Sequence, residues 1–209
     1  MTHTLHRRGT IHPLEDDYVV LMMPSRDIND KGSGEKLQRI FQIARTYDIV
    51  NAGDVRTGSI YKREPEEILN NLSDGSILHV VFEREDELRR FLAELKKENL
   101  GLSVVVSGLF GRVHACLDEI SLSPHTVQYS LGSFGRTELL PPEEILEVTT
   151  MCGHHMVSPN LVKKVVSSIS EGTMTSEEGA RILAKQCLCG VFNLCRARRL
   201  LRSLAGFKP

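Results

Sequence analysis

The sequence predicts an α/β protein with an N-terminal, mostly parallel sheet and flanking helices, followed by a small helical metal-binding domain. Between residues 18 and 130, short apolar runs alternate with segments of helical periodicity. After Pro141-Pro142 the pattern becomes helical throughout. Cysteines concentrate in that second part. We therefore expect an α/β domain over residues 1–140 and a helical Cys/His domain over residues 141–209, in a chain long enough for one core and a small satellite.

The first domain is expected to begin with a buried strand, because Tyr18 to Met23 is almost entirely apolar. Pro65 suits the first position of a helix, and the residues from 85 to 99 carry leucine and phenylalanine at helical spacing. The expected strands are 18–23, 49–55, 77–82, 102–106 and 126–130, and the expected helices are 35–47, 65–72, 85–99 and 110–120.

Alternation of strands with helices favours parallel strands joined by right-handed crossovers. The alternative is a ferredoxin-like α+β sandwich. In it the strand over residues 49–55 pairs antiparallel, and the last helix and strand are additions. Periodicity does not separate these two topologies.

Four helices are expected in the second domain, beginning with residues 143–151. Ser158 is a good N-cap before Pro159. Thr175 and Glu178 form a capping box, and Asn193 can cap a last helix that runs to residue 204. In that helix four arginines indicate a solvated basic face: Arg196, Arg198, Arg199 and Arg202.

Composition limits the function classes. The net charge of −1 gives no general attraction to nucleic acid or membrane, so neither is an expected partner. The N-terminus lacks the apolar run of a signal peptide, and no stretch of about 18 apolar residues occurs. We expect a cytoplasmic protein in which the five cysteines are thiols, since an odd number argues against a disulfide framework.

Four of the five cysteines lie in the last third of the chain, in Cys-Gly-His-His from Cys152 and in Cys-Leu-Cys-Gly-Val-Phe-Asn-Leu-Cys from Cys187. Single cysteines usually serve as small buried apolar residues. Thiolates gathered with imidazoles at short spacing are instead typical of zinc or iron–sulfur sites. The cluster therefore predicts a metal centre.

Two kinds of centre fit the residues. A 4Fe-4S cluster needs four thiolates, which Cys152, Cys187, Cys189 and Cys195 supply, and this is the favoured interpretation. Zinc is the alternative, with Cys152, Cys187, Cys189 and either His154 or His155 as ligands. Adjacent histidines point in different directions, so only one of the pair is expected to reach the metal.

Two similar glycine loops follow expected strands and form a candidate anion site made of Gly108, Gly111 and Arg112 with Gly132, Gly135 and Arg136. Ordinary turns with a surface arginine are the competing interpretation. The sequence thus predicts a metal-binding protein whose cluster serves redox chemistry, sensing or catalysis, with a redox partner protein and an anionic small molecule as expected partners. The alternatives are a non-enzymatic zinc-stabilised binding module and a metal-free anion-binding protein.

Overall fold

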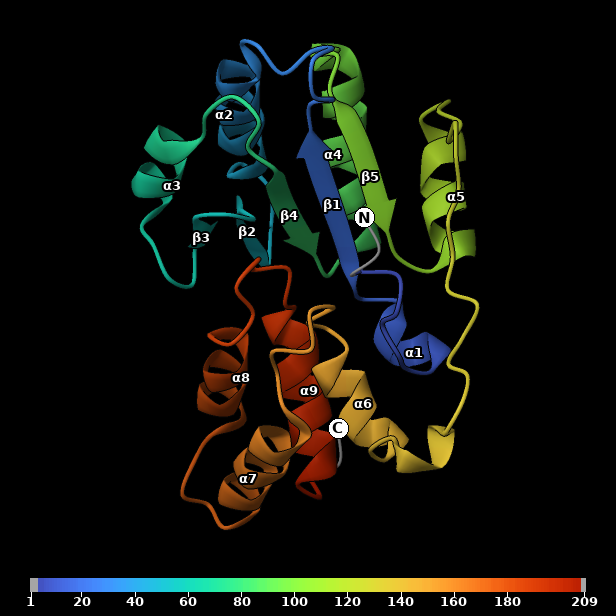
Figure 1. Ribbon diagram of the computed structural model, residues 1–209, viewed down its shortest axis with the longest axis vertical. Helices are drawn as coiled ribbons and strands as arrows, with labels where there is room; N and C mark the ends of the chain where they lie inside the picture. The colour runs from blue at the N-terminus through green and yellow to red at the C-terminus, as the bar shows by residue number, and fades with distance from the viewer. Residues whose placement is uncertain (1–3, 208–209) are drawn as a thin grey trace.

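The N-terminal half of the chain forms a five-stranded sheet, which lies above a helical C-terminal unit in Figure 1, the computed structural model. The structure describes residues 4–207. The strands are β1 (Tyr18–Met23), β2 (Asn51–Asp54), β3 (Gly58–Ser59), β4 (Leu78–Phe82) and β5 (Ser103–Ser107). Their order is β3-β2-β4-β1-β5, and every neighbouring pair is antiparallel.

The expectation of a mostly parallel sheet is therefore wrong, and the topology is compatible with the ferredoxin-like α+β alternative. The helical crossovers do join strands that run in the same direction, β1 to β2 and β4 to β5. Each crossover, however, skips one place in the sheet, and an oppositely directed strand fills that place. The alternation of strands and helices along the chain predicts these crossovers. It does not predict that an antiparallel strand lies between the two strands that each crossover joins.

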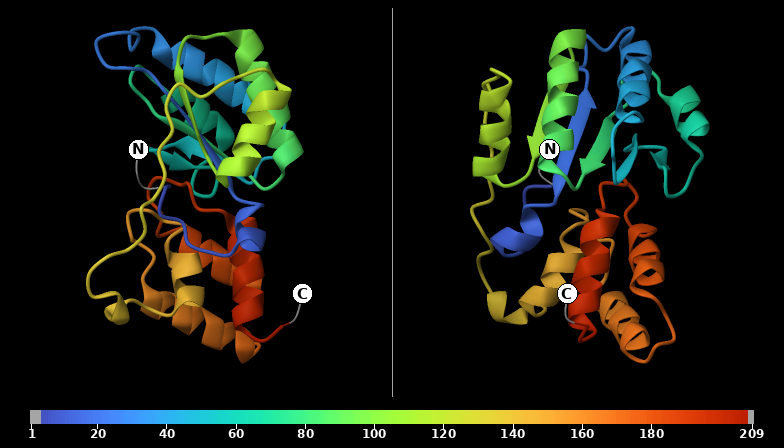
Figure 2. Two further views of the ribbon diagram at one scale, coloured as in Figure 1. Left: turned by 90° about the vertical axis from the view of Figure 1, so that its right-hand side faces the viewer. Right: turned by 180° about the vertical axis from the view of Figure 1, so that it is seen from behind.

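Helices cover one face of the sheet: α2 (Ser33–Ala44), α3 (Pro65–Asn71), α4 (Glu85–Glu98) and α5 (Phe110–Glu119), as the two views of Figure 2 show. Tyr18, Val20 and Met22 of β1 point into this layer and are fully buried. A short helix, α1 (Ile11–Leu14), precedes β1. Successive side chains of a strand point to opposite faces of the sheet. Val19 and Leu21 are also buried, so the second face of the sheet must be covered as well.

The expected strand over residues 126–130 is absent from the described sheet, which is a second correction. These residues belong to an extended connection that follows α5 and ends in the 3-10 turn Thr137–Leu139. No neighbouring strand of the described chain pairs with this segment.

The C-terminal unit consists of α6 (Glu143–Thr149), α7 (Pro159–Ser170), α8 (Ser176–Ala184) and α9 (Leu194–Leu204). The predicted caps are confirmed. Ser158 accepts a hydrogen bond from Leu161 N, Thr175 and Glu178 form a complete capping box, and Asn193 accepts from Arg196 N. Capping side chains thus determine where three of the four helices begin.

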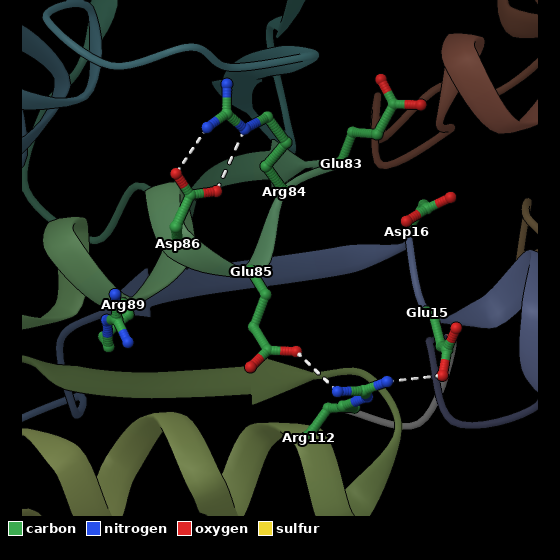
Figure 3. A pocket seen from close by; sticks show the side chains of 8 residues that line it. All are labelled: Glu15, Asp16, Glu83, Arg84, Glu85, Asp86, Arg89 and Arg112. Carbon is green, nitrogen blue, oxygen red and sulfur yellow. Dashed lines mark hydrogen bonds and ion pairs between the residues drawn. The ribbon is translucent and has the colours of Figure 1, made fainter.

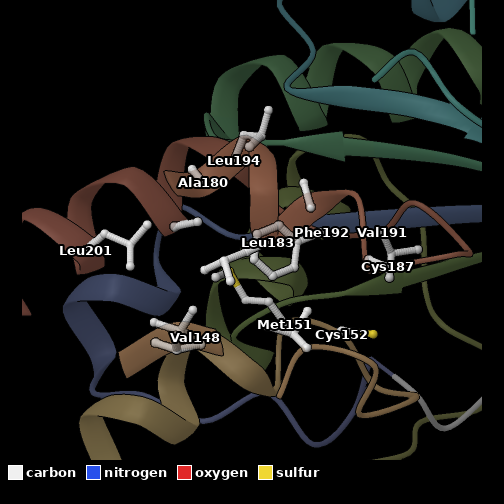
Figure 4. Close-up of a cluster of buried hydrophobic side chains, with 14 of the residues drawn as sticks. Val148, Met151, Cys152, Ala180, Leu183, Cys187, Val191, Phe192, Leu194 and Leu201 are labelled. Carbon is white, nitrogen blue, oxygen red and sulfur yellow. The ribbon is translucent and has the colours of Figure 1, made fainter. Parts of the chain in front are cut away.

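The second face of the sheet packs on this helical unit. Val19 and Leu21 of β1 and Val81 of β4 belong to the same buried cluster as apolar residues of the C-terminal helices and loops, part of which Figure 4 shows. Cys152, Cys187 and Cys189 are members of that cluster. The cysteine loops therefore lie where the helical unit meets the sheet.

Within residues 4–207, no helix has the length and apolar character needed to cross a bilayer.

Candidate metal centre

Three cysteines from two distant segments contact one another. The Cys187 and Cys189 sulfurs are 3.7 Å apart, and the Cys187 thiol also hydrogen-bonds to the Cys152 sulfur. The His154 side chain hydrogen-bonds to Cys189. All three cysteines are buried, whereas His154 is exposed, so the group lies just below the surface. Three sulfurs and one imidazole thus come together across 34 intervening residues.

Backbone N–H groups surround two of these sulfurs. Cys152 accepts hydrogen bonds from the backbone of His154 and Met156, and Cys189 accepts one from the backbone of Val191. Together with the bond from Cys187 they lower the pKa of both thiols, against the opposing effect of burial. The pKa of Cys187 is raised, because it donates to its two neighbours and is buried. Turns that aim amides at sulfur favour thiolate, the form that binds metals.

Gly190 fixes the second cysteine segment against the sheet. It adopts a left-handed conformation with φ of 78°, its N–H bonds to the Cys187 carbonyl at 3.2 Å, and its carbonyl accepts from the Asn51 amide of β2. A Cβ at this position would lie 2.7 Å from Ser59 Cβ and 2.8 Å from His79 Cε1. Only glycine satisfies both the backbone conformation and this close approach.

We expect Gly190→Ala to lower the free energy of unfolding by at least about 2 kcal/mol, because a left-handed conformation and an overpacked contact both become unfavourable. Urea denaturation measures the change. Gly172→Ala is the matched control, since Gly172 has φ of 72° with open space around it and loses only the conformational part, about 1–2 kcal/mol. Equal losses in the two variants would contradict the close contact at Gly190.

A buried ion network connects the two cysteine segments. The Asp17 carboxylate pairs with Arg7 and with Arg196, whose Nη1 lies 2.7 Å away, and all three side chains are almost fully buried. The second terminal nitrogen of Arg7 donates to the carbonyls of Met151 and Val191, at 3.4 Å for Met151. Met151 directly precedes Cys152, and Val191 follows Cys189 by two positions. Arg7 therefore holds the two halves of the site together.

The sequence does not reveal this network. Its pattern predicts Arg196 on a solvated face with the neighbouring arginines, yet Arg196 is completely buried. Asn193 accounts for the difference in part, since it caps α9 and also donates to Asp17 at 3.1 Å. The signal in the sequence is an acidic residue, Asp17, directly before an apolar strand. Acidic side chains at strand ends are mostly solvated, so this position alone does not predict a buried ion pair.

The other two predicted ligands, Cys195 and His155, take no part in the sulfur contacts described above. Cys195 is on the first turn of α9, half-buried, where the charges of Arg198, Glu177 and Asp48 act on its thiol. His155 is exposed, with a positive φ of 55°. The fifth cysteine, Cys116, is buried in the cluster on the other side of the sheet, where burial raises its pKa to about 11.

The glycine loops of the predicted anion site occupy different settings. Gly108 follows β5, and Arg112 lies on the first turn of α5, where it pairs with Glu15 at 2.7 Å. Gly132 and Gly135 lie in the extended connection, and Arg136 pairs with Glu138 at 3.1 Å. Each guanidinium thus already has a carboxylate partner. The anion site stays a prediction.

A surface crevice of about 650 Å³ lies beside α1, α4 and α5 (Figure 3). Its walls are charged, and each of its five carboxylates is paired with an arginine: Glu15 and Glu85 with Arg112, Asp86 with Arg84, and Asp16 and Glu83 with Arg199. Arg112 and Arg199 each serve two carboxylates, so five negative charges meet three positive ones in these pairs and the crevice keeps a net negative charge.

Among residues 4–207, no three His, Cys, Asp or Glu side chains are already arranged around a point where a metal ion would sit. The three thiols instead hydrogen-bond to one another. No protein-family model matches this chain, and no curated protein or solved structure shows significant similarity to it.

Proposed function

We propose that the protein binds a single tetrahedral metal ion, best matched by zinc, through Cys152, Cys187, Cys189 and His154. The observation that carries this proposal is the contact of the Cys187 thiol with both Cys152 and Cys189, with the Cys187 and Cys189 sulfurs 3.7 Å apart. Around zinc, with bonds of about 2.3 Å, tetrahedral geometry separates two sulfurs by about 3.8 Å. Binding then requires loss of the thiol protons and small side-chain rotations.

The donor set favours zinc over a 4Fe-4S cluster. Three thiolates and one histidine are a common structural zinc set. A cubane cluster binds each thiolate to a different iron, so its sulfurs lie farther apart than 3.7 Å. Its fourth thiolate would have to come from Cys195, on which the charges of Arg198 and Glu177 act and none of the other three cysteines does. A cluster with His154 in the fourth position is the second candidate, and it requires the three sulfurs to move apart.

A zinc ion with four protein ligands has no open position for a substrate. We therefore infer a structural role, in which the ion ties the loop after α6 to the loop before α9 and holds the helical unit on the sheet. The protein would act as a zinc-stabilised binding module and not as an enzyme. Five free cysteines, three of them needed as thiolates, suit a reducing compartment such as the cytoplasm.

Anaerobic purification followed by metal analysis tests the proposal. We expect colourless protein with one equivalent of zinc, and with cobalt in its place the visible bands of a tetrahedral thiolate site. Brown protein with iron and sulfide would establish the cluster and overturn zinc. Protein that neither retains nor rebinds any metal would overturn both.

Matched variants identify the ligands. His154→Ala is expected to lower zinc affinity by at least tenfold, while His155→Ala, one residue away, leaves it unchanged. Competition with a chromophoric chelator measures both affinities. Equal affinities in the two variants would exclude His154 as a ligand.

A further inference from the structure

Within residues 4–207, the strand β5 forms an open edge of the sheet. It pairs with β1 on one side, and no other described backbone group bonds to it. Proteins usually protect such an edge with lysine, proline or a bulge, because unpaired N–H and C=O groups recruit other strands. The sequence Ser-Val-Val-Val-Ser from Ser103 has no such protection, and Val104 and Val105 are 40% and 37% exposed.

The connection that follows α5 carries a strand pattern without a strand partner. Val127, Tyr129 and Leu131 alternate with polar residues, and the last two are 72% and 80% exposed. Side chains at this spacing point to one face of an extended segment. One molecule thus contains both an uncovered sheet edge and an uncovered strand-like segment.

The two features belong to one side of the molecule. Figure 1 shows the connection descending on the side where β5 forms the edge of the sheet. The N-terminal segment joins them, since Thr4 Oγ1 lies 2.7 Å from Ser107 Oγ and His6 Nδ1 lies 3.1 Å from Ser130 Oγ. Neither residues 99–111 nor residues 120–135 contain an Asp, Glu, Lys or Arg, although a quarter of the chain is charged.

Lys96 and Arg8 reach the two ends of the connection, at Ile120 and Ser121 and at Ser133. Residues 122–132 between them and the β5 strand contain no charged side chain, and this local neutrality indicates what covers the surface. A charged partner would lose hydration here without gaining an opposite charge, whereas a second neutral, strand-forming segment meets no such cost. The chain itself supplies that segment. In a two-fold dimer each copy presents the same surface, so both open edges can be covered at once.

We propose that two copies of this chain associate through this neutral face, with residues 126–131 of each copy adding as a strand to the β5 edge of the other. The interface lies on the sheet side opposite the short strand β3, and the inference does not depend on the metal centre. In this dimer the predicted strand over residues 126–130 would pair with β5 of the second copy.

Light scattering on the full-length protein across a concentration series tests the association. We expect a mass twice the 23.4 kDa of one chain, falling to one chain in Val105→Lys and in the double variant Tyr129→Lys with Leu131→Lys. Phe207→Lys is the matched control: Phe207 is also half exposed, but it follows α9, and this variant should remain dimeric. Circular dichroism confirms that each variant is folded.

Hydrogen exchange distinguishes strand addition from other contacts. Amides of residues 103–107 and 126–131 should become slower to exchange as protein concentration rises through the dissociation constant, and those of α7 should not change. A wild-type protein that stays monomeric at high micromolar concentration overturns the proposal. So does a dimer that both lysine variants leave intact, or one whose residues 126–131 gain no protection.

Discussion

Protein in which Cys187 and Cys189 are both replaced by serine is expected to lose its metal and the fixed structure of its helical unit. Two of the four proposed ligands come from this segment, and structural zinc contributes about 10–16 kcal/mol of binding free energy that a small unit can use for folding. The helices α2 and α4 pack on the other face of the sheet, in a separate buried cluster, and should remain folded.

Metal analysis combined with hydrogen exchange measures this result. Peptides from residues 143–204 should lose protection, whereas peptides from α4 keep it. Cys195→Ser is the control, because Cys195 is half-buried outside the proposed ligand set and should retain the metal. One equivalent of bound metal in the double variant would refute the assigned ligands.

Replacing Asp17 with asparagine is expected to cost about 3–5 kcal/mol of unfolding free energy. The substitution leaves Arg7 and Arg196 buried without the carboxylate that balances them, and breaking a buried pair from one side has this magnitude. Because Arg7 also bonds to the Met151 and Val191 carbonyls, zinc affinity should fall as well. Urea denaturation of the metal-loaded protein and chelator competition measure the two effects.

The exposed pair Arg39 and Glu98 provides the comparison, because Glu98→Gln should cost less than about 1 kcal/mol. A cost at Asp17 no larger than at Glu98 would show that the buried network contributes little to stability.

Asp17 also gives the protein a pH dependence of known sign. Burial alone would raise the pKa of Asp17, but the charges of Arg7 and Arg196 and the hydrogen bond from Asn193 outweigh it, so the pKa is lowered. A lowered folded-state pKa means that the stabilisation is complete above the unfolded value of about 4 and is lost as the pH falls through the folded value. Asp17→Asn should therefore unfold with a shallower dependence on pH in this acidic range than the wild type.

Local signals in the sequence are sufficient for the helices of the C-terminal unit. Ser158, Thr175 and Asn193 cap the helices that they are predicted to cap, because a capping side chain bonds to amides within three residues of itself. The strands β1, β4 and β5 likewise occur close to where apolar runs predict them. The predicted strand direction is wrong, because the position of a strand in the sheet depends on contacts between residues far apart in the chain.

The sequence by itself determined which chemistry this protein carries: thiols and an imidazole at short spacing, in loops between well-capped helices. Only the tertiary structure decided which of them meet. It brings Cys187 into contact with both Cys152 and Cys189, leaves Cys195 out of these contacts, and buries Arg196 against Asp17. Spacing fixes neighbours along one helix or turn. Contacts between residues 34 or more positions apart depend on how the sheet and the helices pack into one core. A short stretch of sequence carries no information about that packing.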